Sequence, residues 1–345
     1  VRAIVNAVGE TGKGIFEIAG EAPGRSPERN REYHDRLRDL AVESGVTQTW
    51  GMFSVKAAPD IWRPYFDLLD ETATAGGRMF AQVHSRGLNN ILSFESATPY
   101  DNWELWRDIR TLPLEEQKAR LGDPATKAKL VEIANRKYTG PRIVGAEIRP
   151  PDWHYVFPMV DMSYDTPSMA QIAKEKGVDP VELMIDMALE RDLKMFFRAP
   201  IANENQDHVL EMIKHPRSVV TFSDSGAHVS QIMDSSLQTH LLSHWVREKE
   251  ALTLEEAVKQ ITYNTATLWG LHDRGLLREG MAADVVVFDP DTIGPNMPEV
   301  LNDLPAGARR LKQTASGILN TVVNGEILLT DNEYSGATAG RLLRS

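Results

Sequence analysis

The sequence predicts an α/β fold that contains a parallel sheet and ends in a small β domain. Short apolar runs alternate with amphipathic stretches over residues 1–80, which is the pattern of βαβ units. The alternation returns after residue 165, whereas the C-terminal stretch holds short strands separated by turns. We therefore divide the chain into an alternating unit at 1–275, with an insertion at about 88–165, and a small β domain at 276–345.

The alternating unit begins with residues that have the pattern of a helix end. The spacing of apolar residues then distinguishes strands, with period two, from helices, with period 3.6. This spacing predicts a helix end at 1–8, strands at 14–19, 46–53 and 78–83, and helices at 27–43 and 58–75.

The insertion breaks this alternation because it is rich in proline and aromatic residues. Charged helical pieces are predicted at 114–121 and 125–134, and we interpret the whole segment as a lid. After it, the pattern predicts helices from Ser168 and from Pro180 to Glu190, a strand at 193–198, a helix at 204–213 and a strand at 218–222.

Two helices and a set of short strands complete the chain. The helices are predicted at 237–248 and 254–268, and Thr253 with Glu256 forms a capping box for the second. Strands at 318–323 and 326–329 flank Asn324-Gly325, which is a strong hairpin signal. A further strand is predicted at 283–288, so this region is expected to be a β domain.

Composition excludes several classes of function. The net charge is −11, and no cluster of Lys and Arg is present to bind nucleic acid. No apolar run approaches the roughly 18 residues needed to cross a bilayer. The chain has no cysteine, so it supplies neither a disulfide nor a thiolate. We expect a cytoplasmic protein that acts on a small molecule, with neither a nucleic acid nor a membrane as partner.

Asp224 is the strongest candidate for a catalytic residue. It follows the apolar strand 219–222, and counting back in twos places it on the same face as Phe222 and Val220. A carboxylate at the end of an apolar strand is costly unless it binds a metal, a proton or a substrate. The alternative is an aspartate that caps the next helix.

The C-terminal sequence resembles the amidohydrolase superfamily. The resemblance rests on TYNTATLWGLHDRGLLREGMAADVVVFD at 262–289, on 322–326 and on 336–344. Together with the segment 223–228, it is most similar to the N-acyl-D-amino-acid deacylase branch. Two short motifs in the insertion, at 94–96 and 112–114, also resemble members of that branch.

This resemblance implies a TIM-like βα barrel of the metal-dependent hydrolase type, with a small β domain at the C-terminal end. It implies hydrolysis of amide C–N bonds, with deacylation of N-acyl (D-)amino acids or similar small amides as the expected reaction. It further implies that Asp224 acts as general base and acid on a metal-bound water and is itself a metal ligand. The expected cofactor is a divalent metal, with zinc as the first candidate.

The sequence departs from the family pattern in its metal-binding motifs. The His-x-His pair that ends the first barrel strand does not occur, and no cysteine is available as a bridging ligand. The predicted strands match the later part of the barrel, so we expect either a longer polypeptide or a second chain to complete it. A homo-oligomer is a further expectation.

Two histidines are candidates for the site. His84 ends the strand 78–83 and shares a face with Phe80 and Gln82, so it is predicted to be a metal ligand, with a hydrogen-bonded loop residue as the alternative. His228 follows Asp224 by four residues, and we predict that it binds substrate or caps the next segment. His240 and His244 share a helix face, a geometry that can bind a metal, but packing or solvent exposure is the favoured interpretation.

Arg198 and Arg86 are the candidate ligands for a substrate carboxylate. Arg198 closes the strand at 193–198, and Arg86 follows His84 by two residues. A guanidinium group binds a carboxylate through two parallel hydrogen bonds. Each arginine could instead bridge surface acids. Glu17 and Glu21 are weaker candidates for acids that point into the barrel.

Two other functions remain open at this stage. The chain could be a non-catalytic half that completes the barrel of a partner chain. It could also be an amidohydrolase that acts on a cyclic amide. A barrel hydrolase that needs no metal is a third interpretation, which the C-terminal signature disfavours.

Overall fold

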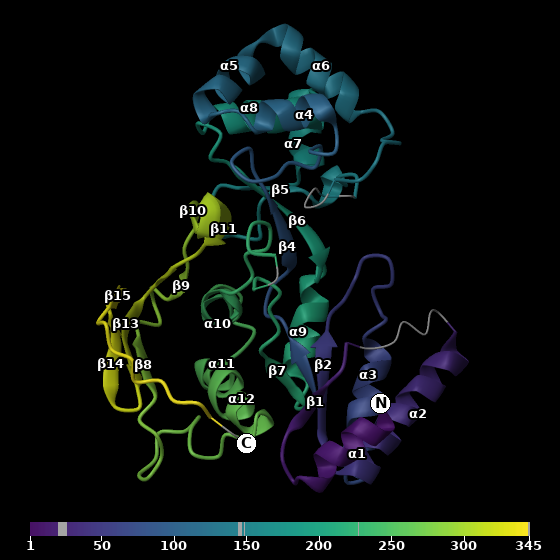
Figure 1. Cartoon of the computed structure of the whole chain (residues 1–345), viewed down its shortest axis with the longest axis vertical. Helices are drawn as coiled ribbons and strands as arrows, with labels where there is room; N and C mark the ends of the chain where they lie inside the picture. The colour runs from purple at the N-terminus through teal and green to yellow at the C-terminus, as the bar shows by residue number, and fades with distance from the viewer. Residues whose placement is uncertain (20–25, 144–146, 148, 227, 344–345) are drawn as a thin grey trace.

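A four-stranded parallel sheet forms the barrel part of the structure, in the order β1–β2–β3–β7 (Figure 1). These strands are Ile15–Glu17, Thr47–Met52, Met79–Val83 and Ser218–Val220. The computed structural model describes residues 1–19, 26–143, 147, 149–226 and 228–343. All four strands lie within segments that the sequence predicts to be strands.

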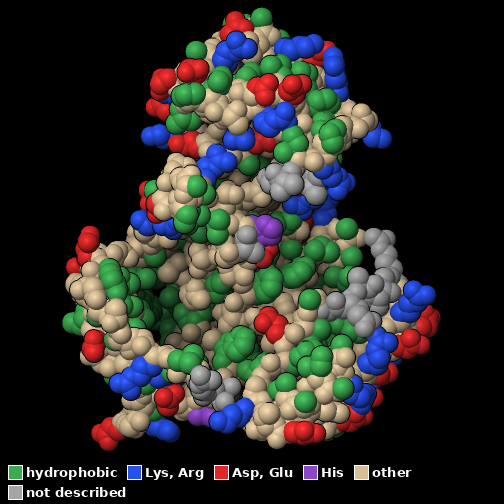
Figure 2. All heavy atoms as spheres, in the orientation of Figure 1, with side chains coloured by type: hydrophobic (Ala, Val, Ile, Leu, Met, Phe, Trp, Pro, Cys, Tyr) green, Lys and Arg blue, Asp and Glu red, His purple; other side chains and the backbone are tan. Residues whose placement is uncertain are grey.

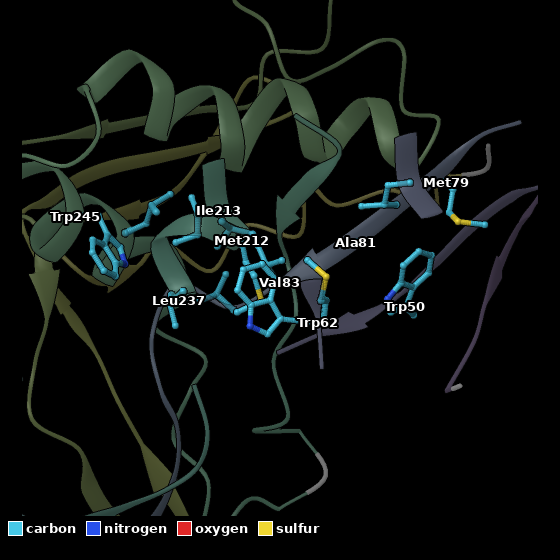
Figure 3. Packing of buried hydrophobic residues seen from close by; sticks show 14 of the residues in the cluster. Trp50, Trp62, Met79, Ala81, Val83, Met212, Ile213, Leu237 and Trp245 are labelled. Atoms are coloured by element: carbon cyan, nitrogen blue, oxygen red, sulfur yellow. The ribbon is translucent and has the colours of Figure 1, made fainter. Parts of the chain in front are cut away.

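Helices on one face of this sheet bury the main hydrophobic core. They are α2 (Pro27–Ser44), α3 (Arg63–Thr74) and α9 (Gln206–Lys214), whereas Val5 of α1 (Arg2–Glu10) packs with Leu40 and Val46 in a small separate cluster. In the main core, Val83 of β3 lies beside Trp62 and Met212, and Trp50 of β2 and Trp245 lie at opposite ends of it (Figure 3). These residues alternate along their strands with residues that face the other way, so the helix-covered face is the apolar one.

The opposite face of the sheet carries polar side chains. Gln82 of β3 donates a hydrogen bond through Nε2 to Glu17 Oε1 of β1 at 2.9 Å. Its Oε1 accepts one from Thr221 Oγ1, just after β7, at 3.4 Å. A polar chain therefore crosses the sheet on the face that no helix of this cluster covers.

The insertion is longer than the sequence predicts. Its base is a sheet in which β6 (Phe196–Ala202) pairs antiparallel with β4 (Leu88–Leu92) and β5 (Phe157–Met159). The predicted strand at 193–198 is therefore not a parallel barrel strand. Leu92 lies opposite Phe197 in the ladder, and both side chains are buried, which holds β6 in this sheet. The insertion therefore extends to residue 202, not to residue 165 as the sequence predicts.

Five helices give the insertion a hydrophobic core of its own. They gather at one end of the molecule in Figure 1: α4 (Glu104–Arg110), α5 (Leu114–Gly122), α6 (Pro124–Ala134), α7 (Met169–Lys176) and α8 (Pro180–Leu189). Trp106, Leu121 and Leu130 are buried in this core. Ser168 and Gln171 form a capping box at the start of α7, as serine at an N-cap favours.

The two helices predicted before the β domain contain π-helical turns. The first consists of α10 (Leu237–His240) and η2 (Leu241–Glu248). The second consists of α11 (Leu254–Lys259), η3 (Gln260–Asn264) and α12 (Thr265–Leu268). The π turns are a local difference from the α-helices that the apolar spacing predicts, and such turns are frequent at functional sites.

The C-terminal region forms small antiparallel sheets. In the larger one, β15 (Glu333–Tyr334), β14 (Glu326–Thr330), β13 (Ile318–Val323) and β8 (Val285–Phe288) are neighbours in that order. Asn324 and Gly325 both have positive φ, as a tight turn between β13 and β14 requires. The pairs β9 (Gly294–Pro295) with β12 (Ala315–Ser316), and β10 (Glu299–Leu304) with β11 (Ala308–Lys312), complete the region.

An apolar groove separates the β8–β13 sheet from the helices of η2 to η3. Figure 2 shows it as a hollow lined with hydrophobic side chains, and its volume is about 850 Å³. Val286 of β8 and Leu277 before it are more than half exposed. An exposed groove lined mainly by apolar side chains is a candidate contact region. Within the described ranges, no helix is long and apolar enough to span a membrane.

We predict that Leu121→Ala destabilises the insertion. Leu121 is fully buried in the insertion core, so the substitution leaves a cavity that costs about 2–5 kcal/mol of unfolding free energy. Urea unfolding measures this loss. Val160→Ala, at a side chain 47% exposed in the same insertion, is the control and should cost less than about 0.5 kcal/mol. Equal costs for both variants would contradict the packing described here.

Candidate active site

Asp224 lies where β7 ends, at the carboxyl edge of the parallel sheet. Strand β7 stops at Val220, and the chain then turns through Ser223 to Gly226. The carboxyl edge of a parallel sheet is where βα barrels carry their chemistry. The Asp224 side chain is 39% exposed, so its carboxylate can reach a bound molecule.

A second aspartate, Asp234, holds this turn in place. Its buried carboxylate accepts hydrogen bonds from Ser223 Oγ at 2.7 Å and from the Asp224 backbone N–H at 3.1 Å. Burial alone would raise the pKa of Asp234. The hydrogen bonds from His84, Ser223 and the Asp224 backbone outweigh burial and lower this pKa to about 2. Asp234 is therefore ionised, and it orients Asp224 through the backbone.

His84 extends this arrangement from the end of β3. Its Nε2 lies 3.2 Å from the Asp234 carbonyl oxygen and 3.5 Å from Asp234 Oδ2. Its Nδ1 accepts a hydrogen bond from the Arg86 backbone N–H at 3.1 Å. Burial lowers the pKa of His84, so the ring is neutral, with its proton on Nε2. Both ring nitrogens are occupied, which leaves no lone pair for the predicted metal-ligand role.

His228 lies beside Asp224 and faces solvent. Its Nε2 is 3.9 Å from Asp224 Oδ2, and its side chain is 55% exposed. The predicted proximity of these two residues is therefore present in the structure.

Arg86 is buried and already bonded. Its Nη1 donates to Ser236 Oγ at 2.6 Å, and its Nε donates to the Tyr164 hydroxyl at 3.3 Å. The same hydroxyl also accepts from the Gly87 N–H at 3.1 Å and from Asn89 Nδ2 at 3.4 Å. Arg86 therefore positions Tyr164 of the insertion, and this finding argues against the predicted role in binding substrate.

Arg198 lies on β6, next to the same tyrosine. Its Nη2 donates to the Tyr164 carbonyl oxygen at 3.3 Å, and its guanidinium carbon lies 4.5 Å and 4.1 Å from the ring centres of Phe157 and Tyr164. Arg198 borders a cavity of about 450 Å³ whose lining does not include Asp224. The structure therefore places Arg198 and Asp224 at different openings.

The remaining candidates lie away from this turn. Glu17 is exposed at the end of β1 and bonds to Gln82, whereas Glu21 lies outside the described residues. His240 and His244 stack with ring centres 4.8 Å apart and are buried, as the packing interpretation predicts.

The residues at hand do not fit a complete metal site. In the described ranges, no three His, Asp or Glu side chains are placed to hold one ion. Zinc in a catalytic site needs three protein ligands and an open position. His84 and Asp234 bond to each other, which leaves only Asp224 and His228 open at the turn.

Asp234 and Tyr164 are the two site residues that sequence reasoning missed. Asp234 lies ten residues beyond Asp224 in an irregular segment, so no periodicity identifies it. Its only sequence signal is an acid that directly follows the apolar pair Ile232-Met233. Tyr164 carries no signal, because its role arises from tertiary contacts with Arg86 and Arg198.

Comparison with known proteins gives a consistent family. The model of the Amidohydrolase family matches residues 158–329. D-aminoacylase of Alcaligenes xylosoxydans xylosoxydans is 35% identical over 103 residues, which cover 30% of this chain and 19% of that protein. N-acyl-D-glutamate deacylase of the same organism is 54% identical over 55 residues, 16% of this chain and 11% of that protein.

A solved structure agrees with the fold. It was described for the functional role of the binuclear metal center in D-aminoacylase, and it matches with a TM-score of 0.55 at 17% identity. The match covers 99% of this chain and 59% of the other. The chain thus spans well under two thirds of its relatives, and its partial TIM-like barrel and β domain correspond to part of theirs.

We predict that Asp234→Asn lowers stability at neutral pH by about 2 kcal/mol, the value of a carboxyl pKa lowered from 3.8 to about 2. The native pKa lies below the unfolded one, so this stabilisation is present above pH 4 and is lost as the pH falls through 2. The difference in unfolding free energy between wild type and variant should therefore become smaller at acidic pH. Urea unfolding at pH 7, 5 and 3 measures this difference.

Asp331→Asn, a substitution at an exposed residue, is the control for this series. Its difference in unfolding free energy from wild type should not change with pH. A difference for Asp234→Asn that is constant from pH 7 to pH 3 would contradict an ionised, hydrogen-bonded Asp234.

Proposed function

Because the chain belongs to the amidohydrolase family, we propose that the complete protein hydrolyses the amide bond of a small N-acyl amino acid and that Asp224 carries the proton. One observation supports this assignment. Asp224 lies at the end of a parallel strand, its backbone is fixed by a buried anion, and its own carboxylate is open.

Amide hydrolysis requires a base and then an acid, and one carboxylate can serve as both. In the proposed reaction, Asp224 accepts a proton from the attacking water as the C–O bond forms. It then donates that proton to the nitrogen as the C–N bond breaks. The products are a carboxylic acid and a free amine, and Asp224 returns to its ionised form.

The second open group at the turn is His228. We propose that it binds the substrate beside Asp224, because it is near enough to contact the same molecule and is not buried. Neither arginine is proposed as a ligand of the substrate carboxylate at Asp224. Arg198 borders a cavity that Asp224 does not line, and Arg86 already bonds to Ser236 and Tyr164.

We further propose that a divalent metal, zinc first, is held in the complete protein mainly by residues outside this sequence. The relatives are longer than this chain, and the solved D-aminoacylase has a binuclear metal center. The apolar groove along β8 and β13 gives a surface that such a further segment, or a second chain, would cover. A further copy of this chain is the third candidate for covering the groove.

We predict that Asp224→Asn lowers kcat at least 100-fold, because an amide cannot exchange the proton. The assay is hydrolysis of N-acetyl amino acids by the complete protein. The exposed Asp291→Asn should keep wild-type activity and serves as the matched control.

Activity that survives Asp224→Asn would favour the alternative that this chain is a non-catalytic half of the barrel. An enzyme that is inactive on N-acetyl amino acids but opens a cyclic amide, and that still depends on Asp224, would instead assign the other substrate class.

We also predict that His84→Gln leaves the zinc content of the complete protein unchanged. The ring nitrogens of His84 bond to Asp234 and to the Arg86 N–H, and a glutamine amide can replace the bond that Nε2 makes to Asp234. Atomic emission after desalting gives the zinc per molecule. Loss of one equivalent, with the fold intact by circular dichroism, would restore the metal-ligand role.

A further inference from the structure

Two buried arginines lie close to each other without a carboxylate. Arg86 is 1% exposed and Arg198 is 4% exposed. Within the described part of the chain, neither has an ion pair with an acid inside 4.0 Å; their partners are Ser236, Tyr164 and aromatic rings. Buried charges are normally paired, so this cluster lacks an anion.

Tyr164 compensates only part of this charge. Its hydroxyl accepts three hydrogen bonds, from Arg86, Gly87 and Asn89, which favours its ionised form. Burial opposes that ionisation, yet the two guanidinium groups bring the pKa of Tyr164 below its usual value. Even an ionised tyrosine neutralises only one of two guanidinium groups, so the pair keeps at least one unmatched positive charge.

Arg198 faces the cavity of about 450 Å³, and His244 lies in the same wall. His244 is 3% exposed, its Nδ1 lies 3.1 Å from Glu248 Oε2, and its Nε2 has no partner. The carboxylate fixes the proton on Nδ1, and burial lowers the pKa of His244, so Nε2 is a bare acceptor. Arg198 and His244 both contact the Tyr164 ring.

The exposed side of the cavity has the opposite charge. Asp165 and Asp207 are exposed and Glu204 is half-buried. Lys249 bonds to Asp165, at 3.2 Å, and Lys56 lies over the Tyr155 ring, pairs with Asp152 and attracts Glu204, so two lysines balance only part of the acidic charge of this rim. The cavity therefore offers one buried cation and an acidic rim.

Apolar side chains complete the lining. They come from the insertion, from α9 and from the π-helical turn: Tyr155, Phe157, Leu210, Trp245 and Ala251. A volume of this size is within the range of small-molecule sites, which are mostly apolar with a few fixed polar groups.

We propose that this cavity binds a free α-amino acid as a zwitterion. The carboxylate pairs with the Arg198 guanidinium, and the ammonium group faces the acidic rim. The side chain contacts the apolar wall. A simple carboxylate leaves the acids unmatched, and a simple amine leaves Arg198 unmatched, so neither fits the charges as well.

This site is distinct from the opening at Asp224, which does not line the cavity. Hydrogen bonds nevertheless connect the two, from Arg198 to Tyr164, Arg86, His84 and Asp234. If the proposed function is right, a free amino acid is the reaction's product class, and that part of the inference rests on the proposed function. The binding itself does not depend on it.

Calorimetry on the complete protein with Asp224→Asn tests the site without turnover. The probes are leucine (both enantiomers), N-acetylleucine, 4-methylpentanoate, which lacks the ammonium group, and 3-methylbutylamine, which lacks the carboxylate. We expect one leucine enantiomer or both to bind at least tenfold more tightly than the other three probes. Equal binding of 4-methylpentanoate, or no binding of leucine, would overturn the proposal.

Variants then assign the two ends of the ligand. Arg198→Gln should weaken leucine binding at least tenfold, and Arg310→Gln, in an exposed pair with Asp303, should not change it. If Arg198→Gln fails to fold, Glu204→Gln with Asp207→Asn at the rim gives a second test. That variant should lose the preference for leucine over 4-methylpentanoate, and a retained preference would contradict the ammonium assignment.

Competition separates the site from substrate binding. In protein with Asp224 intact, leucine should change the rate of N-acetyl amino acid hydrolysis non-competitively, because it occupies a different opening. Purely competitive inhibition that Arg198→Gln leaves unchanged would place leucine at Asp224 and overturn the separate site. An inactive protein that still binds leucine would contradict only the proposed function.

Discussion

The candidate site depends on one buried anion, the carboxylate of Asp234. It joins three parts of the chain that are distant in sequence: the turn after β7, His84 at the end of β3 and the segment that enters α10. A buried ion is tolerated only when hydrogen bonds replace its water, and these bonds come from the groups that need to be fixed. The same interaction therefore stabilises the charge and sets the position of Asp224. The reactive carboxylate is held through its backbone, so its own oxygens stay free.

Buried cations organise the insertion in the same way. Arg86 extends from the barrel and Arg198 from β6, and both meet Tyr164. Each guanidinium would be costly alone, but their shared aromatic and phenolic partner fixes the insertion against the strand ends. The positive charge near Arg198 stays unmatched because the side chain is buried in this arrangement. Water would stabilise the same charge on a surface arginine.

The sequence predicted well what depends on local pattern, and less well what depends on tertiary pairing. Strand β3 and helix α2 follow from apolar periodicity and lie where that periodicity predicts. The strand at 193–198 also exists, but its partner does not follow from its own residues, so its place in the insertion could not be predicted. Asp224 was predicted because strand and acid are adjacent. Asp234 was missed because a hydrogen-bonded acid in an irregular segment leaves no periodic trace.

The polar face of the parallel sheet distinguishes it from the inside of a closed apolar barrel. Glu17, Gln82 and Thr221 form a chain across it, and side chains of this kind are costly on the inside of a closed apolar barrel. They are reasonable if that face lines a site where water and substrate enter. In the described ranges no set of metal ligands is assembled on this face, whereas Asp224 lies at its carboxyl edge with an open carboxylate. If the proposed function is right, this polar face and Asp224 form one side of the site at which the amide is hydrolysed.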